Sequence, residues 1–333
     1  MPGLTNNNNS RRLFVGSCFA LISTSVVFGV LSAMIGDFKT IFALSNTEVG
    51  WVRGAANWGF AISIIIFGPL CDVLGMRRLL RFSFVCHIVG PLLMILAQNN
   101  ENPFWMLFSG ALIIALANGT VEAVCNPLIA TIFPNRKTQK LNQFHMWFPG
   151  GIVIGGLLAF GIDHLPANIW NNFFMASWQL KLSLVFVPTI IYGIVFSRQN
   201  FPATERLQSG VSFGEMFKET LFRPLFIVLF ISISLTASLE LGPNNWMGEV
   251  MKKVMSFAGD NAGILVLVYG STLMAILRYF AGPVVHKLSP VGVLLASAIF
   301  AGIGLTALTY AQLPLTIFVS ATIFYVGVCY CWP

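Results

Sequence analysis

The sequence is short of charged residues. Only 9% of its 333 residues are Asp, Glu, Lys or Arg, whereas a soluble globular domain carries about 25%. Hydrophobic residues make up 56%, thirty of them phenylalanine, and the mean hydropathy is +0.79. So little polar surface excludes an ordinary soluble enzyme or binding module.

Histidine and cysteine are also scarce, with four and six residues. The histidines fall in different predicted loops and helices, so we expect no nucleophile–base pair, no metal site, no cofactor and no enzyme activity. The cysteines lie in or beside apolar runs without the paired spacing of a zinc site, and we interpret them as packing residues. The net charge of +7 does not indicate nucleic-acid binding, because the basic residues sort by loop.

Long apolar runs are abundant instead. A membrane-spanning helix needs roughly 20 mostly apolar residues. The N-terminus MPGLTNNNNSRR is a polar tail, and the run after it is long enough to span rather than to be removed as a signal peptide. The sequence therefore predicts an all-α membrane protein embedded in the lipid bilayer, with about ten spans at residues 13–34, 51–70, 79–97, 104–126, 141–161, 178–197, 223–241, 263–281, 291–309 and 313–331.

The basic residues indicate the topology. Fourteen of the nineteen Lys and Arg residues fall on the side of the N-terminus, which the positive-inside rule assigns to the cytoplasm of a plasma (inner) membrane protein. The longest internal polar stretch follows the sixth span. We therefore expect a six-helix half at 1–197, a cytoplasmic linker at 198–222 and a partial second half of about four helices at 223–333.

Two stretches repeat between corresponding spans. GPLCDVLGMRR begins at Gly68 and GPVVHKLSPVG begins at Gly282, and such repeats are typical of two-halved transporters. The first copy resembles the loop signature G-x-L-x-D-x-x-G-R-[RK] of the major facilitator superfamily. The resemblance implies two six-helix halves, so that the C-terminal end of the fold is missing here. The matching residues are Gly68, Leu70, Asp72, Gly75, Arg77 and Arg78.

The signature loop is a candidate conformational gate. Glycine at 68 and 75 lets two helix ends approach closely. Asp72 can pair with Arg77 or Arg78, and an ion pair present in one conformation only would bias outward-open against inward-open states. The alternative is that the arginines merely anchor the cytoplasmic side.

The stretch ANGTVEAVCNPLIA places polar groups inside an apolar run. Asn118, Glu122 and Asn126 are spaced by four residues, so they form one helical stripe that drifts only ~40° per step. Pro127 bends the helix beside them. An ionisable residue at membrane depth indicates a functional site, whereas a hydrogen-bonding stripe between helices is the structural alternative, especially for the two asparagines.

The next span contains LNQFHMWFPGG. Asn142, His145 and Pro149 share one face, and His145 can titrate near neutral pH or be a satisfied polar residue at the cytoplasmic end. Pro149-Gly150-Gly151 does not match the antiporter signature of the superfamily, which disfavours an antiporter.

This region resembles the L-fucose permease branch of sugar–proton symporters. The branch has Glu-x-x-x-Asn-Pro on helix four, matched by Glu122 to Pro127, and Leu-Asn on helix five, matched by Leu141 and Asn142. The resemblance implies that Glu122 takes part in sugar binding and proton handling. The first outer loop fits as well, at Phe42, Leu44, Asn46 and Gly50.

One position departs from that branch. Ser32 stands where the branch has an acid on helix one, and Asp37 is near but out of register. Coupling to a proton, coupling to sodium and facilitated diffusion therefore all stay open.

The seventh span adds further candidates. Glu240 is followed by Asn245 and Trp246, an amide and an aromatic ring that suit sugar hydroxyls and an apolar sugar face, although Trp246 also fits an interfacial belt. Arg53 and Asn57, one turn apart on the second span, can reach Glu240 or an anionic substrate. We expect Arg278 to be a cytoplasmic-side anchor.

Together these patterns predict a monomeric secondary transporter that moves a small hydrophilic solute, a sugar first of all, by alternating access. The first candidates for the site are Glu122, Asn126, Asn142 and Glu240. An organic-anion carrier that uses Arg53 and Arg278 is the alternative within transporters, and a non-transporting membrane sensor is the alternative outside them.

The topology can be tested by labelling single introduced cysteines with a membrane-impermeant reagent. A cysteine at Glu205 should react only from the cytoplasmic side, and one at Lys252 only from the outside. Labelling of both from one side would contradict the six-plus-four arrangement.

Overall fold

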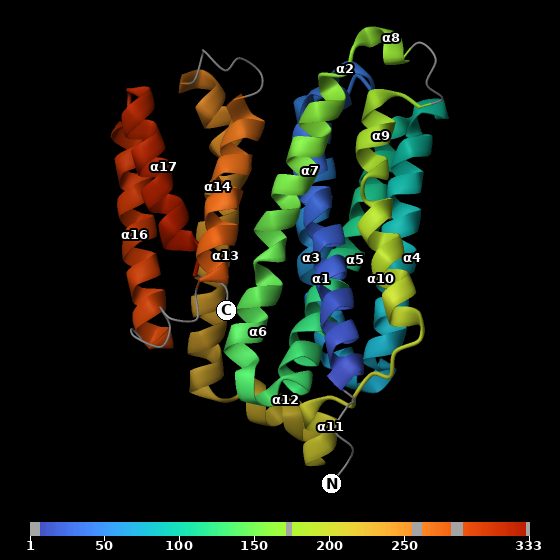
Figure 1. Ribbon diagram of the computed structural model, residues 1–333, viewed down its shortest axis with the longest axis vertical. Coiled ribbons are helices and arrows are strands. Elements are labelled where there is room, and N and C mark those ends of the chain that lie inside the picture. The colour runs from blue at the N-terminus through green and yellow to red at the C-terminus, as the bar shows by residue number, and fades with distance from the viewer. Residues whose placement is uncertain (1–6, 171–174, 255–261, 281–288, 331–333) are drawn as a thin grey trace. The chain divides into compact units, whose positions relative to one another are not determined.

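The computed structural model describes residues 7–170, 175–254, 262–280 and 289–330 (Figure 1). Every regular element in these ranges is a helix, which confirms the all-α prediction. Seven helical stretches of this part are long and apolar enough to cross a membrane, and three shorter apolar helices accompany them. Each of the ten expected spans has its helical counterpart.

The chain forms two compact units. The first comprises Met1–Lys137 and Ile154–Glu205. Helix α5 lies at its centre and packs against α1, α3 and α4, while α10 packs against α1 and α4. Its helices are α1 (Asn7–Ala33), α2 (Ile35–Thr40), α3 (Asn46–Leu74), α4 (Met76–Leu96), η1 (Ala97–Asn99), α5 (Pro103–Ile132), η2 (Pro134–Arg136), α8 (Ala167–Trp170), α9 (Ser177–Ser183) and α10 (Phe186–Ser197).

The second unit comprises Thr138–Val153 and Arg206–Pro333. It includes nearly all of α6 (Lys137–His145) and the start of α7 (Trp147–Asp163), which precede the expected linker in sequence. The division of the chain into halves around residues 198–222 stays a prediction. The remaining helices are α11 (Glu205–Ser209), α12 (Phe213–Leu221), α13 (Pro224–Val254), α14 (Ala262–Tyr279), α16 (Pro290–Tyr310) and α17 (Pro314–Val328).

Close helix crossings in the first unit depend on small residues. A Cβ atom added to Gly119 of α5 would overlap the carbonyl oxygen of Phe60 and lie 2.7 Å from the Cβ of Ser63, both on α3. Ser63 donates a hydrogen bond of 2.7 Å to the carbonyl oxygen of Leu116 at the same crossing. Without a hydrophobic driving force between helices in lipid, such backbone approach and hydrogen bonding hold the helices together.

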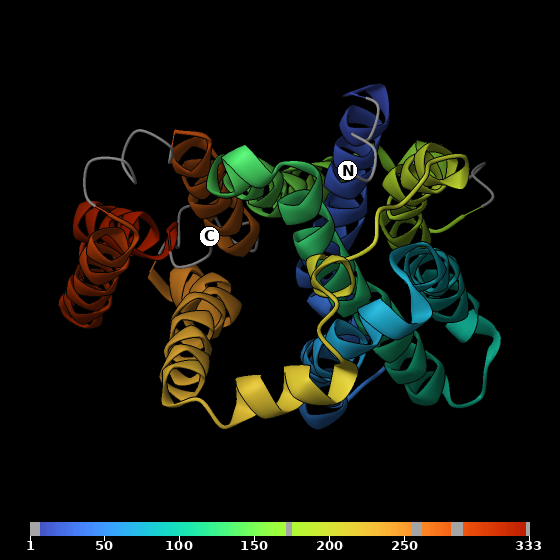
Figure 2. The same cartoon turned by 90° about the horizontal axis from the view of Figure 1, so that it is seen from below.

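Small residues also allow a close helix crossing in the second unit. Helices α16 and α17 run side by side (Figures 1 and 2). A Cβ on Gly304 would overlap the backbone nitrogen of Phe324, and one on Gly327 would overlap that of Ala301. The two helices therefore touch along their backbones at two levels.

Two expected spans are each divided into two helices. The span at 141–161 breaks between α6 and α7 at Met146, and the span at 178–197 breaks between α9 and α10 at Leu184 and Val185. Proline has no N–H and clashes with the carbonyl four residues earlier. Pro149 lies three residues after the first break, and Pro188 lies three or four residues after the second.

The signature loop is a very tight turn. Helix α3 ends at Leu74, α4 begins at Met76, and Gly75 between them has φ = +82° and ψ = 143°. A side chain is strained in this region, so glycine is required there. Gly68 and Asp72 thus belong to the last turns of α3, and Arg77 and Arg78 to the first turn of α4.

The linker contains two short helices rather than only coil. Helix α12 begins with a capping box, in which the Ser212 hydroxyl accepts from the backbone N–H of Glu215 and the Glu215 carboxylate accepts from the backbone N–H of Ser212. A hydrogen bond between the Ser212 side chain and the Glu215 carboxyl, and then the one from the backbone N–H of Ser212, hold the pKa of Glu215 below its usual value.

Helix α13 continues to Val254, beyond the expected end of the seventh span at residue 241. Pro243 lies inside it without ending it. The second copy of the repeat, from Gly282, begins outside the described residues. Five cysteines are buried, as expected of packing residues, and the sixth, Cys331, lies outside the described part.

The crossing of α3 and α5 makes a stability prediction. Gly119→Ala should lower the free energy of unfolding by about 1–3 kcal/mol, because the new methyl group overlaps the α3 backbone. Thermal unfolding in detergent measures the change. Gly161→Ala is the control, because nothing lies within 4 Å of its added Cβ. Equal melting temperatures for the two variants would contradict the packing of this crossing.

Candidate functional site

The polar stripe of α5 lies in the apolar centre of the first unit. Glu122 is only 9% exposed although it is a carboxylic acid. The side-chain amide of Asn126 donates to Glu122 Oε2 at 2.9 Å and to the Glu122 carbonyl oxygen at 3.0 Å. Asn126 therefore fixes the rotamer of the carboxylate from one turn away on the same helix.

Asn118, one turn earlier, belongs to a different network. Its side-chain oxygen lies 2.8 Å from Nε2 of His87 on α4, and Nδ1 of the same ring lies 2.9 Å from the hydroxyl of Tyr192 on α10. All three side chains are buried. Asn118 thus ties three helices together, which is the structural alternative for this residue. His87 and Tyr192 were not candidates from sequence, where nothing links positions so far apart.

The candidates on α6 are buried in the second unit. Asn142 is 5% exposed, and its amide donates to the carbonyl oxygen of Thr138 at 3.0 Å. His145 is 3% exposed and stands at the last position of α6. Both residues therefore lie in the interior of the protein.

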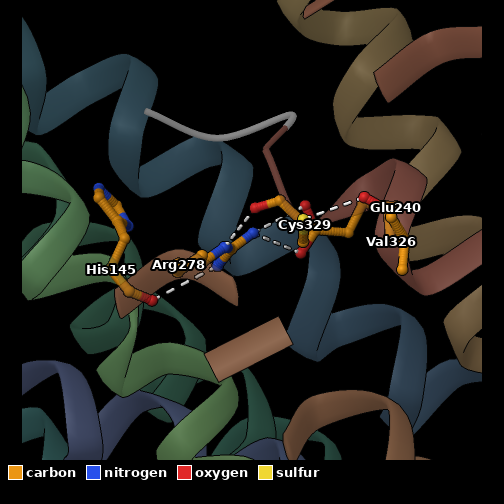
Figure 3. A network of polar contacts seen from close by, with 5 residues as sticks. All are labelled: His145, Glu240, Arg278, Val326 and Cys329. Carbon is orange, nitrogen blue, oxygen red and sulfur yellow. Dashed lines mark hydrogen bonds and ion pairs between the residues drawn. The ribbon is translucent and has the colours of Figure 1, made fainter. Parts of the chain in front are cut away.

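A buried ion pair occupies the second unit. Nη2 of Arg278 lies 3.1 Å from Oε1 and 3.3 Å from Oε2 of Glu240, and the two side chains are 2% and 4% exposed (Figure 3). Glu240 lies near the middle of the 31-residue helix α13. The guanidinium also donates from Nε to the carbonyl oxygen of Cys329 at 2.8 Å and from Nη1 to that of His145 at 3.4 Å.

The ion pair bears on two expectations from the sequence, the role of Arg278 and the partner of Glu240. Arg278 was expected to be a cytoplasmic-side anchor, but its charge is not exposed to act as one, because the side chain is buried and paired with Glu240. Both carboxylate oxygens of Glu240 are bound by Arg278, whereas the sequence suggested Arg53 or Asn57. On α3, Arg53 is half-buried and Asn57 is exposed. The side chains of Asn245 and Trp246 lie outside the described part of the chain.

The signature loop is held by hydrogen bonds to the segment 199–204, which follows α10. The Thr204 hydroxyl donates to Oδ1 of Asp72, and Nη2 of Arg77 donates to the carbonyl oxygen of Gln199. The Arg77 guanidinium also lies 5.9 Å from the ring centroid of Phe201. Gly68 has nothing within 4 Å of an added Cβ, and Arg78 is exposed.

A second buried cation was missed by sequence reasoning. Lys181 of α9 is 1% exposed, and its Nζ lies 2.8 Å from Oδ2 of Asp37 and 2.5 Å from Oδ1 of Asp163. Asp37 on α2 is the acid near the end of the first span. Its carboxylate therefore neutralises a lysine 144 positions away in the chain. A lysine in an apolar run was the one sequence signal for this cluster.

Buried charges and amides inside a bundle of apolar helices define an integral membrane protein whose interior carries polar sites. Comparison of the sequence with models of protein families identifies the family. The model of the Major Facilitator Superfamily matches residues 13–332, so the chain belongs to this superfamily of membrane transporters. The resemblance first seen in the loop around Asp72 is confirmed by this match.

Curated relatives include sugar transporters. The chain is 24% identical over 264 residues to a probable sugar efflux transporter of Haemophilus influenzae strain 86-028NP, which covers 78% of this chain and 61% of the relative. It is 28% identical over 170 residues to the glucose transporter GlcP of Staphylococcus epidermidis, covering 50% of this chain and 35% of that one. The chain thus spans less than two thirds of the length of these relatives.

Solved structures share the fold. The proton:xylose symporter XylE superposes with a TM-score of 0.74 at 15% identity, over 97% of this chain and 80% of XylE. A variant of the E. coli fucose:proton symporter FucP superposes with a TM-score of 0.71 at 14% identity, over 95% of this chain and 81% of FucP. At such identity the likeness shows the fold alone.

Proposed function

We propose that the protein is a secondary transporter that moves a small hydrophilic solute, a sugar, across the membrane by alternating access. The observation that carries this proposal is the buried carboxylate of Glu122, held by Asn126 inside an apolar helix. A carboxylic acid is an expensive choice for packing in a bilayer and marks a functional site. The sugar-transporter relatives and the fold of XylE and FucP support the solute class.

The pair of Glu122 and Asn126 suits a polyhydroxylated solute. A carboxylate accepts two or more hydroxyl donors, and an amide offers both a donor and an acceptor. The stripe therefore supplies the directional hydrogen bonds that distinguish one sugar from another. Its apolar surroundings strengthen each of them, since little water competes there.

Glu122 is also our proposed coupling group for a proton. Ser32 stands where an acid was expected on the first span, and Asp37 is already paired with the buried ammonium of Lys181. The amide of Asn126 can hydrogen-bond either protonation state of Glu122, as a donor to the carboxylate or as an acceptor from the carboxylic acid. A proton taken up on one side and released on the other would then drive symport.

The alternative of an organic-anion carrier loses one of its two arginines. Arg278 would have to meet the substrate with its charge, but Glu240 neutralises that charge within the second unit. We further propose a monomer in the plasma membrane. The distribution of basic residues favours a cytoplasmic N-terminus.

Glu122→Gln tests the coupling role. The amide keeps the size and hydrogen-bonding capacity of the side chain but cannot titrate, so the variant should retain solute binding or exchange and lose pH-driven accumulation. Uptake of labelled sugars by cells expressing the transporter, with and without an imposed proton gradient, measures both. The control is Glu205→Gln, because Glu205 is an exposed carboxylate that pairs with Lys137.

Three other outcomes carry distinct meanings. Normal accumulation by Glu122→Gln under a proton gradient would show that Glu122 is not the coupling group. Complete loss of binding would make the carboxylate mainly an acceptor for solute hydroxyls. Accumulation that follows a sodium gradient instead would replace the proton in the mechanism.

We also propose that the signature loop acts as a conformational gate. Asp72 and Arg77 both contact the segment 199–204 just before α11, where the chain leaves the first unit. A group that holds this exit in one conformation changes the rate of interconversion between states rather than the solute contacts.

Asp72→Asn should therefore lower the maximal transport rate several-fold while the KM for solute stays nearly unchanged. Thr204→Val removes the hydroxyl that donates to Asp72 and should change the rate in the same direction. Initial rates of uptake over a range of solute concentrations separate the two parameters. A raised KM with an intact maximal rate would contradict the gate.

A further inference from the structure

The break in the fifth span leaves a backbone carbonyl without its usual donor. In a continuous helix the carbonyl oxygen of His145 would accept from the N–H of residue 149. Residue 149 is proline, which has no N–H. Helix α6 accordingly stops at His145, and α7 starts at Trp147. Within a membrane, an unsatisfied carbonyl is costly and needs another donor.

Arg278 lies at this carbonyl. Its Nη1 is 3.4 Å from the His145 oxygen, a long hydrogen bond in buried surroundings. The imidazole of His145 points away from the guanidinium, whereas its carbonyl oxygen faces it (Figure 3). The contact is therefore made to the backbone of the break and not to the histidine side chain.

The same guanidinium also donates a hydrogen bond at the C-terminal end of helix α17. Helix α17 ends at Val328, and the carbonyl oxygen of Cys329 accepts from Nε of Arg278 at 2.8 Å. The last carbonyls of a helix lack intrahelical donors. One guanidinium thus donates to two backbone carbonyls, each at the end of a helix.

Glu240 determines how the guanidinium points. Both of its oxygens bind Nη2, which leaves Nε and Nη1 directed at the two carbonyls. The fork of an arginine can make these contacts together, whereas the ammonium of a lysine is a single point donor. The ion pair also removes the cost of burying an unpaired charge.

From these contacts we propose that Arg278 is a positioning residue for the transport cycle. It pins the break of the fifth span, at His145, to helices α13, α14 and α17, and Glu240 orients it for this task. Pro149 creates a hinge at this break, and the hydrogen bond from Arg278 to the His145 carbonyl holds the hinge in one conformation. The role in transport rests on the proposed function, whereas the pinning of the break stands on the contacts alone.

The pinning can be measured by hydrogen–deuterium exchange of the chain in lipid nanodiscs. Arg278→Lys keeps the charge beside Glu240 but loses the fork. Exchange of the amides in the segment 146–153 should rise about fivefold, the factor for one net hydrogen bond of about 1 kcal/mol. In the Pro149→Ala background, where the substituted residue has an N–H to donate to the His145 carbonyl, Arg278→Lys should cause no such rise.

Pro188→Ala provides the matched control. It restores an N–H at the other proline break, between α9 and α10, in the first unit. In this background Arg278→Lys should still raise exchange in the segment 146–153 about fivefold. An equal rise in the Pro149→Ala background, or a rise confined to α13 around Glu240, would overturn the proposal, because Arg278 would then only neutralise the carboxylate.

Pro149→Ala keeps the proposal testable even if Arg278→Lys does not fold. With Arg278 in place, it should by itself slow exchange in the segment 146–153 several-fold, because the helix can close across the break. Exchange equal to that of the native chain would overturn the proposal. The measurement needs no solute, so a failure of sugar transport would not affect it.

The role in transport has its own readout. Arg278→Lys should lower the maximal uptake rate several-fold with little change in KM, and this effect should be much smaller in the Pro149→Ala background. A change in KM alone would assign Arg278 to the solute and contradict a positioning role. Absence of sugar uptake in the native protein would count against the proposed function only.

Discussion

A polar group inside an apolar helix bundle must find its partner within the protein. The hydrocarbon core of a bilayer supplies no water, and each unsatisfied polar group in it costs several kcal/mol. The buried ion pair of Arg278 and Glu240 and the buried Lys181 between two aspartates both meet this constraint. Such contacts decide which helices lie side by side, and they give an otherwise uniform bundle its specific arrangement.

The same constraint applies to the backbone. Pro149 and Pro188 coincide with breaks between helices, yet Pro127 and Pro243 lie inside continuous helices. A proline therefore removes a donor everywhere, but the helix divides only at some of these positions. At the break after His145 the missing donor is replaced by a side chain from another helix. The replacement converts a local defect into a connection between helices.

The superfamily fold tolerates very different sequences. This chain shares only 14–15% identity with XylE and FucP, although the folds superpose over nearly its whole length. Apolar helices with small residues at their crossings can be built from many sequences, so the fold alone does not identify a solute. In the proposed function, the interior polar side chains, Glu122 first, make that distinction.

Within one helix the sequence was a good guide. The membrane class, the ten apolar segments, the tight turn at Gly75 and the alignment of Glu122 with Asn126 all follow from composition, periodicity and local spacing. These features arise from residues that are near one another in the chain. Physical rules for short stretches therefore suffice to predict them.

Contacts between helices were decided only by the tertiary structure. Arg278 lies 38 positions from Glu240, Tyr192 lies 105 positions from His87, and Lys181 lies 144 positions from Asp37. Periodicity tells which face of a helix is polar, but not which helix that face will meet. Many pairings would satisfy the same charges and amides, and the packing of the whole bundle selects one. For this reason the sequence predicts Arg278 to be a cytoplasmic-side anchor, whereas in the fold it is buried and contacts Glu240, His145 and Cys329.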